Sequence, residues 1–212
     1  REVDRVVIDP AKTFTVCQYD DGPLVELGNA RVFLASRQGQ VGHDIPLLCA
    51  AHRAPRRTPQ TRYRAAFVGR LWTHALRQEM ADALGDRQDV LIYDGDRSTR
   101  FFVCKLLSAE IALCPRGYGG SSFRLFEAMQ MARPPLLLSD VDTRPFRRVL
   151  PWDDFSFYAA RASDLPRLID ERSSDELAEM GRRAHRVLRE ELTYGRWWSH
   201  VINELADLQS SS

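Results

Sequence analysis

Short apolar runs alternate with segments of helical periodicity over the middle of the chain, from residue 64 to residue 160. Short bounded apolar runs are typical of buried strands, whereas apolar residues spaced three and four apart are typical of helices. The expected strands lie at residues 64–68, 89–93, 111–114, 136–139 and 155–158, and the expected helices at 73–84, 98–107, 122–131, 162–169, 174–192 and 194–208. This alternation predicts an α/β fold with a doubly wound, mostly parallel sheet, whose ligands bind at the carboxyl ends of the strands.

The first 55 residues have a different pattern. Residues 13–19 alternate like a strand and end in a turn with the sequence Asp20-Asp21-Gly22-Pro23, and residues 30–35 predict a second strand. Residues 51–64 hold two prolines and many arginines, which is typical of a linker or an exposed crossing. We therefore expect a reduced N-terminal segment (1–55), a ligand-binding domain (60–195) and a C-terminal helix (196–212) that packs back on the first part.

Charge and composition narrow the possible classes of protein. The net charge is +1, from 30 Lys and Arg and 29 Asp and Glu side chains, which disfavours a general nucleic-acid-binding protein. The longest apolar runs are too short to span a membrane, and the first residues lack the apolar core of a signal peptide. The four cysteines show no CxxC spacing, so we expect free thiols and a reducing, cytoplasmic compartment.

The richest chemical motif follows the expected strand at residues 111–114. It is a glycine-rich turn, Pro115-Arg116-Gly117-Tyr118-Gly119-Gly120, after which a helix begins at Ser121 or Ser122 and carries Arg124 in its first turn. Such a turn presents backbone N–H groups and the positive end of a helix to an anion. Arginine adds a planar guanidinium suited to phosphate. The turn is therefore predicted to bind a diphosphate.

The same region resembles a known family. The block LCPRGYGGSSFRLFEAMQMARPPLLLSD, followed by PF and LPWDDFSF, is similar to the C-terminal half of exostosin-like glycosyltransferases, as are the upstream segments FVGR and QYDDGPL. The resemblance is best over residues 60–205. It implies a GT-B-type fold of two Rossmann-like lobes, with the donor held mainly by the C-terminal lobe.

The resemblance also implies a function. Members of this family transfer a hexosyl or glycuronosyl group in polysaccharide biosynthesis, typically with inversion and without a tightly bound metal or other cofactor. The donor is then a UDP- or GDP-linked sugar, and the acceptor is a glycan, a lipid or a protein. The residues before the linker are too few for a complete acceptor lobe, so that lobe is either reduced or supplied elsewhere, by a second copy or a partner chain.

Roles for single residues follow from the chemistry of a leaving nucleoside diphosphate. The negative charge that develops on this leaving group is expected to be stabilised by guanidinium groups and by the backbone amides of residues 119–122. The guanidinium groups are those of Arg70, Arg116 and Arg124. The resemblance assigns Glu127 to the ribose hydroxyls, and Asp140, at the next strand end, is a candidate for donor sugar or ribose. A general base for the acceptor hydroxyl is sought in Asp20 and Asp21, with His43 and Asp44 as a further pair.

Other interpretations remain open at this stage. The turn and the aspartates can be purely structural, and Arg77 is expected to be solvated on a helix face. The histidines show no metal-binding spacing, so no metal site is predicted. A dinucleotide-binding oxidoreductase would place a third glycine where Ser122 stands. A non-catalytic nucleotide-sugar-binding module is the alternative outside enzymes.

Overall fold

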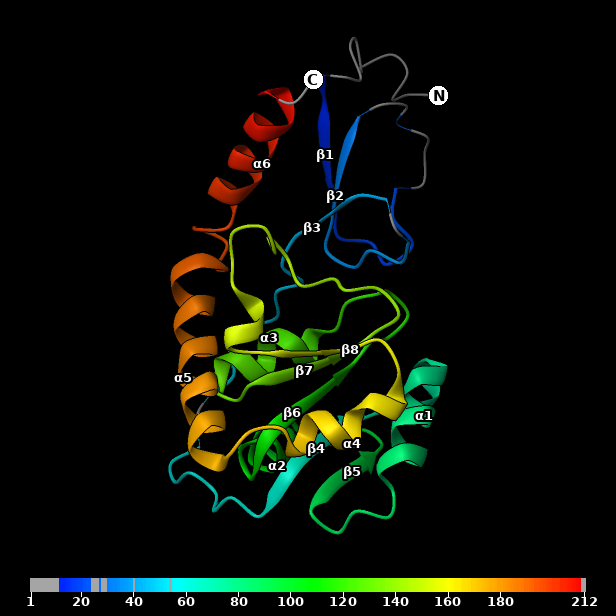
Figure 1. Ribbon diagram of the computed structural model, residues 1–212, viewed down its shortest axis with the longest axis vertical. Helices are drawn as coiled ribbons and strands as arrows, with labels where there is room; N and C mark the ends of the chain where they lie inside the picture. Colours follow the sequence, from blue (N-terminus) through cyan, green and yellow to red (C-terminus); the bar gives the residue numbers. More distant parts are fainter. Residues whose placement is uncertain (1–11, 24–26, 28–29, 40, 54, 211–212) are drawn as a thin grey trace.

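Two parallel sheets form the framework of the molecule (Figure 1). The computed structural model describes residues 12–23, 27, 30–39, 41–53 and 55–210. The larger sheet has the strand order β5-β4-β6-β7-β8, with every neighbouring pair parallel. Its strands are β4 (Tyr63–Gly69), β5 (Val90–Asp94), β6 (Ala109–Pro115), β7 (Pro135–Leu138) and β8 (Phe157–Ala159). The predicted α/β fold with a parallel sheet is confirmed.

The smaller sheet is built from the N-terminal part of the chain. Its order is β1-β2-β3, also parallel, and its strands are β1 (Phe14–Cys17), β2 (Arg31–Leu34) and β3 (His43–Asp44). The C-terminal helix α6 (Trp198–Ser210) lies beside this sheet in Figure 1, and Nδ1 of His43 lies 3.4 Å from a carboxylate oxygen of Glu204 in α6.

Helices cover both faces of the larger sheet. The helices α1 (Ala75–Leu84) and α4 (Leu165–Asp170) share one core cluster with the strands, and α2 (Thr99–Leu107) and α3 (Phe123–Gln130) pack on the opposite face. The long helix α5 (Ser174–Glu191) contributes side chains to two of these clusters. Short 3-10 turns occur at Leu71–Thr73, Trp152–Asp154 and Ala162–Asp164.

Alternation along each strand explains why the strands are continuous apolar runs in the sequence. Phe67 of β4 packs in the cluster of α1 and α4, whereas its neighbour Val68 packs in the cluster of α2. In β6, Leu113 likewise packs in the cluster of α1 and α4, and Cys114 in the cluster of α2. Successive side chains point to opposite faces of a strand, so a sheet covered on both faces needs apolar residues at every position.

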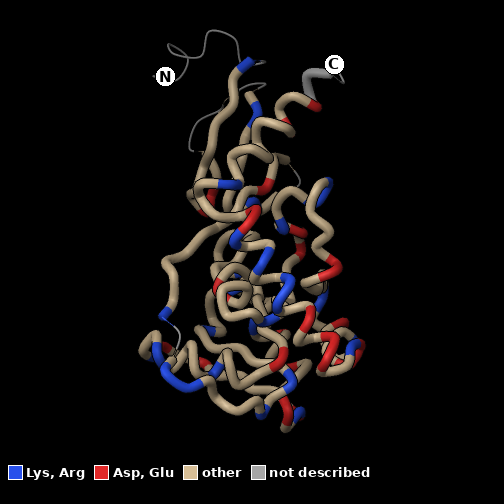
Figure 2. Tube along the Cα trace, turned by 90° about the vertical axis from the view of Figure 1, so that its left-hand side faces the viewer, with Lys and Arg blue, Asp and Glu red and all other residues tan. Residues whose placement is uncertain are grey.

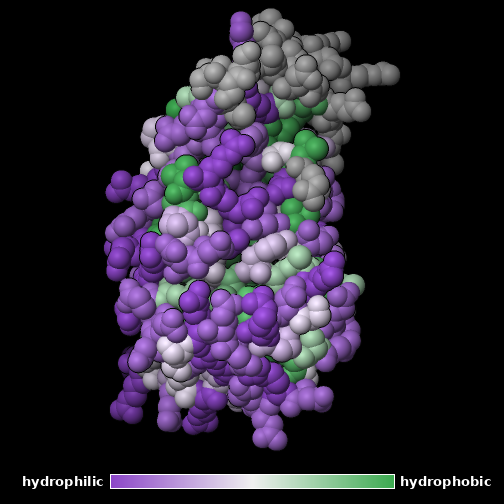
Figure 3. All heavy atoms as spheres, viewed as in Figure 1, coloured by the Kyte–Doolittle hydropathy of each residue, from purple (hydrophilic) through white to green (hydrophobic). Residues whose placement is uncertain are grey.

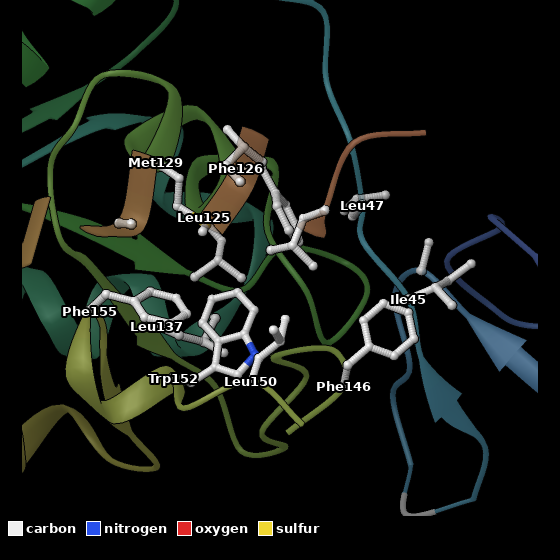
Figure 4. Close-up of a cluster of buried hydrophobic side chains, with 14 of the residues drawn as sticks. Ile45, Leu47, Leu125, Phe126, Met129, Leu137, Phe146, Leu150, Trp152 and Phe155 are labelled. Carbon is white, nitrogen blue, oxygen red and sulfur yellow. The ribbon is translucent and has the colours of Figure 1, made fainter. Parts of the chain in front are cut away.

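A third core cluster joins the N-terminal part to the larger domain (Figure 4). Ile45 and Leu47, which follow β3, lie against the loop residue Phe146 and against side chains of α3. Val201 of α6 belongs to the same cluster. The face of the molecule seen in Figure 3 is mostly hydrophilic outside these cores. Within the described ranges, no helix combines the length and apolar character that crossing a membrane requires.

Candidate functional site

The strand order reverses direction between β4 and β6, because the chain passes from β4 to its neighbour β5 and then returns to β6 on the other side. Ligands of open parallel sheets bind at such a reversal, beyond the carboxyl ends of the strands. Two hollows of about 200 and 250 Å³ lie there and share Thr73, Arg77 and Arg124 in their walls. We call the two together the strand-end crevice.

Arg124, in the first turn of α3, lines both hollows of the crevice. Its Nε donates a hydrogen bond to the carbonyl of Val68 at 3.0 Å, and Nη1 is ion-paired with Glu127. The guanidinium carbon lies 4.4 Å from the centre of the Phe102 ring. A Cβ atom at Gly69 would come within 3.4 Å of Nη2, so the absence of a side chain at the end of β4 leaves room for this arginine. Arg124 is thus a fixed positive charge in the crevice wall.

Arg77 also lines both hollows, and here the expectation of a solvated side chain is wrong. Its guanidinium donates to the carbonyls of Arg70 and Arg116, each at 2.8 Å, and to that of Pro115 at 3.4 Å. No acidic partner of Arg77 occurs among the described residues. Burial and the nearby charge of Arg124 lower the pKa of Arg77 to about 10, which leaves it charged at neutral pH. The sequence signal was its place on the helix that follows the end of β4.

Ser121 supplies an unpaired hydroxyl on the same wall. The residue is buried, with 4% of its surface exposed, and it lines the crevice. Its Oγ has no hydrogen-bond partner within the described chain, whereas its N–H donates to Oγ of Ser36 at 3.4 Å. Ser122, the next residue, caps α3 by accepting a hydrogen bond from the N–H of Arg124. Buried hydroxyls without a partner are uncommon, and one in the wall of a hollow is placed to bond a ligand.

Arg116 lies behind the glycine-rich turn and is not in the crevice wall. It is buried, donates to the carbonyls of Tyr118 and Gly119 at 3.2 Å each, and is ion-paired with Asp140. Burial raises the pKa of Asp140, but the hydrogen bond and charge of Arg116 outweigh it, so that pKa is lowered. Arg116 and Asp140 therefore hold the shape of the turn, while Gly117, Tyr118 and Gly119 line the crevice.

Two glycines of the turn are needed because the N-terminal part packs against them. A Cβ atom at Gly119 would lie 1.8 Å from Oγ of Ser36, and one at Gly120 would lie 1.9 Å from the carbonyl oxygen of Arg37. Close approach of another segment of this chain, rather than of a phosphate, accounts for glycine at position 120.

Glu127 lies below the crevice wall. One carboxylate oxygen pairs with Nε2 of His52 at 2.8 Å, and the other with Arg124. Sequence reasoning missed His52, which comes from the linker. Cys49, His52 and Glu127 place ligand-type atoms within 4.8 Å of one another. Burial, and next the charge of Glu127, raise the pKa of Cys49 to about 11, so its thiol is protonated. The carboxylate of Glu127 is thus shared between His52 of the linker and Arg124 of α3.

The candidate bases and Arg70 lie at different places, and only some of them line the strand-end crevice. Asp20 lines the crevice, whereas the carboxylate of Asp21 accepts a hydrogen bond from the Gln38 amide at 3.3 Å and lies outside it. Arg70 lines the larger of the two hollows of the crevice, in an exposed ion pair with Asp96. His43 and Asp44 lie in a different hollow, where Asp44 is ion-paired with Arg37 at 2.7 Å.

No family model matches the sequence. Among solved structures the chain is similar to TarM, a GT-B-type glycosyltransferase, with a TM-score of 0.52 and 10% sequence identity over 91% of this chain. The chain spans 50% of the length of TarM. At this identity the likeness establishes the fold, which is that of GT-B proteins, and it does not single out the exostosin-like family.

Proposed function

We propose that this chain forms the donor-binding part of a glycosyltransferase, and that the strand-end crevice holds the diphosphate of a nucleotide sugar. The GT-B-type fold supports the class of enzyme, and the position of the crevice at the reversal of strand order supports the place of the donor. The resemblance to exostosin-like enzymes favours a UDP- or GDP-linked hexose or uronic acid as donor, with a glycan, lipid or protein acceptor.

The observation that carries the proposal is the unpaired Ser121 hydroxyl in a hollow that is also lined by two arginines. Ser121, Arg77 and Arg124 line one hollow, and Arg77 lacks an acidic partner within the described chain. A diphosphate brings several negative charges and many acceptor oxygens, so it would satisfy the hydroxyl, neutralise Arg77 and accept further hydrogen bonds from Arg124, which already pairs with Glu127. The N-terminus of α3 adds its dipole at the same place.

The proposed reaction is a direct displacement at the anomeric carbon. The acceptor hydroxyl loses its proton to Asp20, its oxygen bonds to the anomeric carbon, and the bond from that carbon to the diphosphate oxygen breaks. The electron pair leaves with the nucleoside diphosphate. Arg77, Arg124 and the amides at the start of α3 would stabilise that charge, which is the role a metal ion plays in other enzymes, so we propose metal-independent transfer with inversion.

The test combines binding with turnover. Nucleoside diphosphate release from UDP- and GDP-sugars is measured for the wild type, Arg124→Ala and Asp20→Asn, with Arg186→Ala on the exposed face of α5 as the matched control. We expect Arg124→Ala to weaken nucleoside diphosphate binding at least about tenfold, because a charge-assisted hydrogen bond is lost. Asp20→Asn should abolish turnover and keep donor affinity.

The results also separate the alternatives. Donor binding without turnover in any condition would favour a non-catalytic nucleotide-sugar-binding module. Binding of NAD in place of nucleoside diphosphates would favour a dinucleotide-binding oxidoreductase. Equal donor affinity in Arg124→Ala and the wild type would show that the crevice is not the donor site.

A further inference from the structure

A separate hollow lies between the linker and α2. We call it the linker groove; its walls are residues 51–53 and 55–57 of the linker and the first turns of α2 from Thr99 to Cys104. Its volume is about 820 Å³, larger than either hollow of the strand-end crevice. Volumes of this size are typical of sites for small molecules.

The groove is lined by four arginines and by no acidic side chain, namely Arg53, Arg56, Arg57 and Arg100. All four are exposed, and none of their guanidinium groups forms a hydrogen bond or an ion pair within the described part of the chain. Several other arginines are paired with carboxylates: Arg87, for example, pairs with Asp89 and Asp170. Blue segments of the linker follow one another along the lower left of Figure 2. The groove is therefore a local concentration of uncompensated positive charge in a chain of nearly balanced charge.

Helix α2 adds to this charge and supplies an apolar floor. It begins at the groove, and its first turn holds no acidic residue that would offset the positive end of the helix dipole. Val103, which is buried, and Cys104 line the groove beneath the arginines, together with Pro55 of the linker. The site thus combines charged walls with a surface for carbon atoms.

The groove and the strand-end crevice are distinct but lie back to back. His52 lines the groove, and its ring centre lies 5.5 Å from that of Phe102, which lines the crevice. The walls of the two sites therefore touch at these two rings. A ligand in the groove would not occupy the place proposed for the donor diphosphate.

We propose that the linker groove binds a small oligoanion, a compound that carries several phosphate or sulfate groups on a compact carbon skeleton. Guanidinium groups bind such oxyanions through paired, charge-assisted hydrogen bonds, and the floor of Val103 and Pro55 contacts the skeleton. This inference goes beyond the proposed function and does not depend on which donor the crevice holds.

The experiment compares two variants of equal charge. The groove variant is Arg56→Gln, Arg57→Gln, Arg100→Gln. The control variant is Arg186→Gln, Arg189→Gln, Arg196→Gln, whose arginines line a different hollow, at the end of α5, together with Glu190. Calorimetric titration with tripolyphosphate and, separately, with sucrose octasulfate distinguishes phosphate from sulfate ligands. We expect binding to the wild type, a Kd at least about tenfold higher in the groove variant, and an unchanged Kd in the control variant.

Titration with UDP and GDP completes the design, because the groove variant should bind the preferred nucleoside diphosphate as the wild type does. Loss of both ligands in the groove variant would overturn a separate site, as would equal losses in both variants or no oligoanion binding by the wild type. Arg100→Gln alone serves as a second variant should the triple substitution unfold the chain, and it is expected to weaken oligoanion binding in the same direction. Failure of UDP and GDP to bind the wild type would count against the crevice and leave the groove unaffected.

Discussion

At the scale of single residues, the role of each arginine depends on what surrounds its guanidinium group. Arg116 and Arg124 belong to one sequence motif, yet Arg116 supports the turn from behind and Arg124 lines the crevice. The sequence identifies the motif but not this division, because residue type does not reveal burial. Arg77 was missed for the same reason: its three partners are backbone carbonyls, which leave no trace in the sequence.

Replacement of Arg77 tests its double role. Arg77→Gln removes three hydrogen bonds that join the ends of β4 and β6, so we expect a loss of about 2 kcal/mol in the free energy of unfolding and weaker nucleoside diphosphate binding. Urea denaturation and calorimetric titration measure the two effects. Arg186→Gln, on an exposed helix face, should change neither quantity. A variant of Arg77 with wild-type stability would show that its carbonyl contacts contribute nothing.

The thiol of Cys49 reports on the charge of Glu127. Its pKa is raised to about 11, first by burial and then by that carboxylate, so the reactive thiolate is scarce at neutral pH. Alkylation of Cys49 by iodoacetamide, followed by mass spectrometry, should therefore be slow at about pH 8 and should still accelerate above about pH 9, the range in which an ordinary thiol is already ionised. In Glu127→Gln the pKa falls, and the rate at about pH 8 should rise several-fold. Cys17 in the same sample is the internal control, and an equal rise there would refute the coupling.

At the scale of elements, the join between β6 and α3 combines two functions. The turn presents Gly117, Tyr118 and Ser121 to the crevice, and its other side is packed against residues 36–37. The sequence predicted the strands from the apolar pattern and the start of α3 from the Ser122 cap, because both are local signals. The sequence did not predict the packing of Ser36 against the turn, because Ser36 and Ser121 are 85 positions apart in the chain.

Alanine substitutions in the turn separate these two sides. Gly120→Ala places a Cβ atom on the backbone of Arg37, and we expect a loss of about 3 kcal/mol in the free energy of unfolding. At Gly117 the nearest atom to an added Cβ is Nη2 of Arg77, at 3.3 Å, the mobile end of a side chain. Gly117→Ala should therefore unfold close to the wild type while disturbing the crevice. Thermal denaturation compares the two variants. A Gly117→Ala variant less stable than Gly120→Ala would contradict this packing.

At the scale of the whole molecule, the crevice is assembled from both parts of the chain. The helices α1 and α3 and the turn before α3 supply Arg77, Arg124 and Ser121, and the N-terminal part supplies Asp20 and Leu47. The alternating pattern predicted the α/β fold with a parallel sheet, since each element of the larger sheet is encoded locally, whereas the GT-B type was implied by the family resemblance. The position of the N-terminal part had no such signal, because a mixed apolar core such as that in Figure 4 depends on contacts between distant segments. The chain spans 50% of TarM, so the acceptor side of a complete enzyme stays a proposal.

The central claim is that a nucleoside diphosphate fills the crevice around Ser121, and one variant tests it most directly. In Ser121→Ala an unpaired buried hydroxyl disappears, so the melting temperature should stay the same or rise. The same change removes a ligand contact, so the Kd for UDP or GDP, measured by calorimetric titration, should rise by about three- to tenfold. A lower melting temperature together with unchanged affinity would show that the hydroxyl stabilises the fold and does not bind the donor.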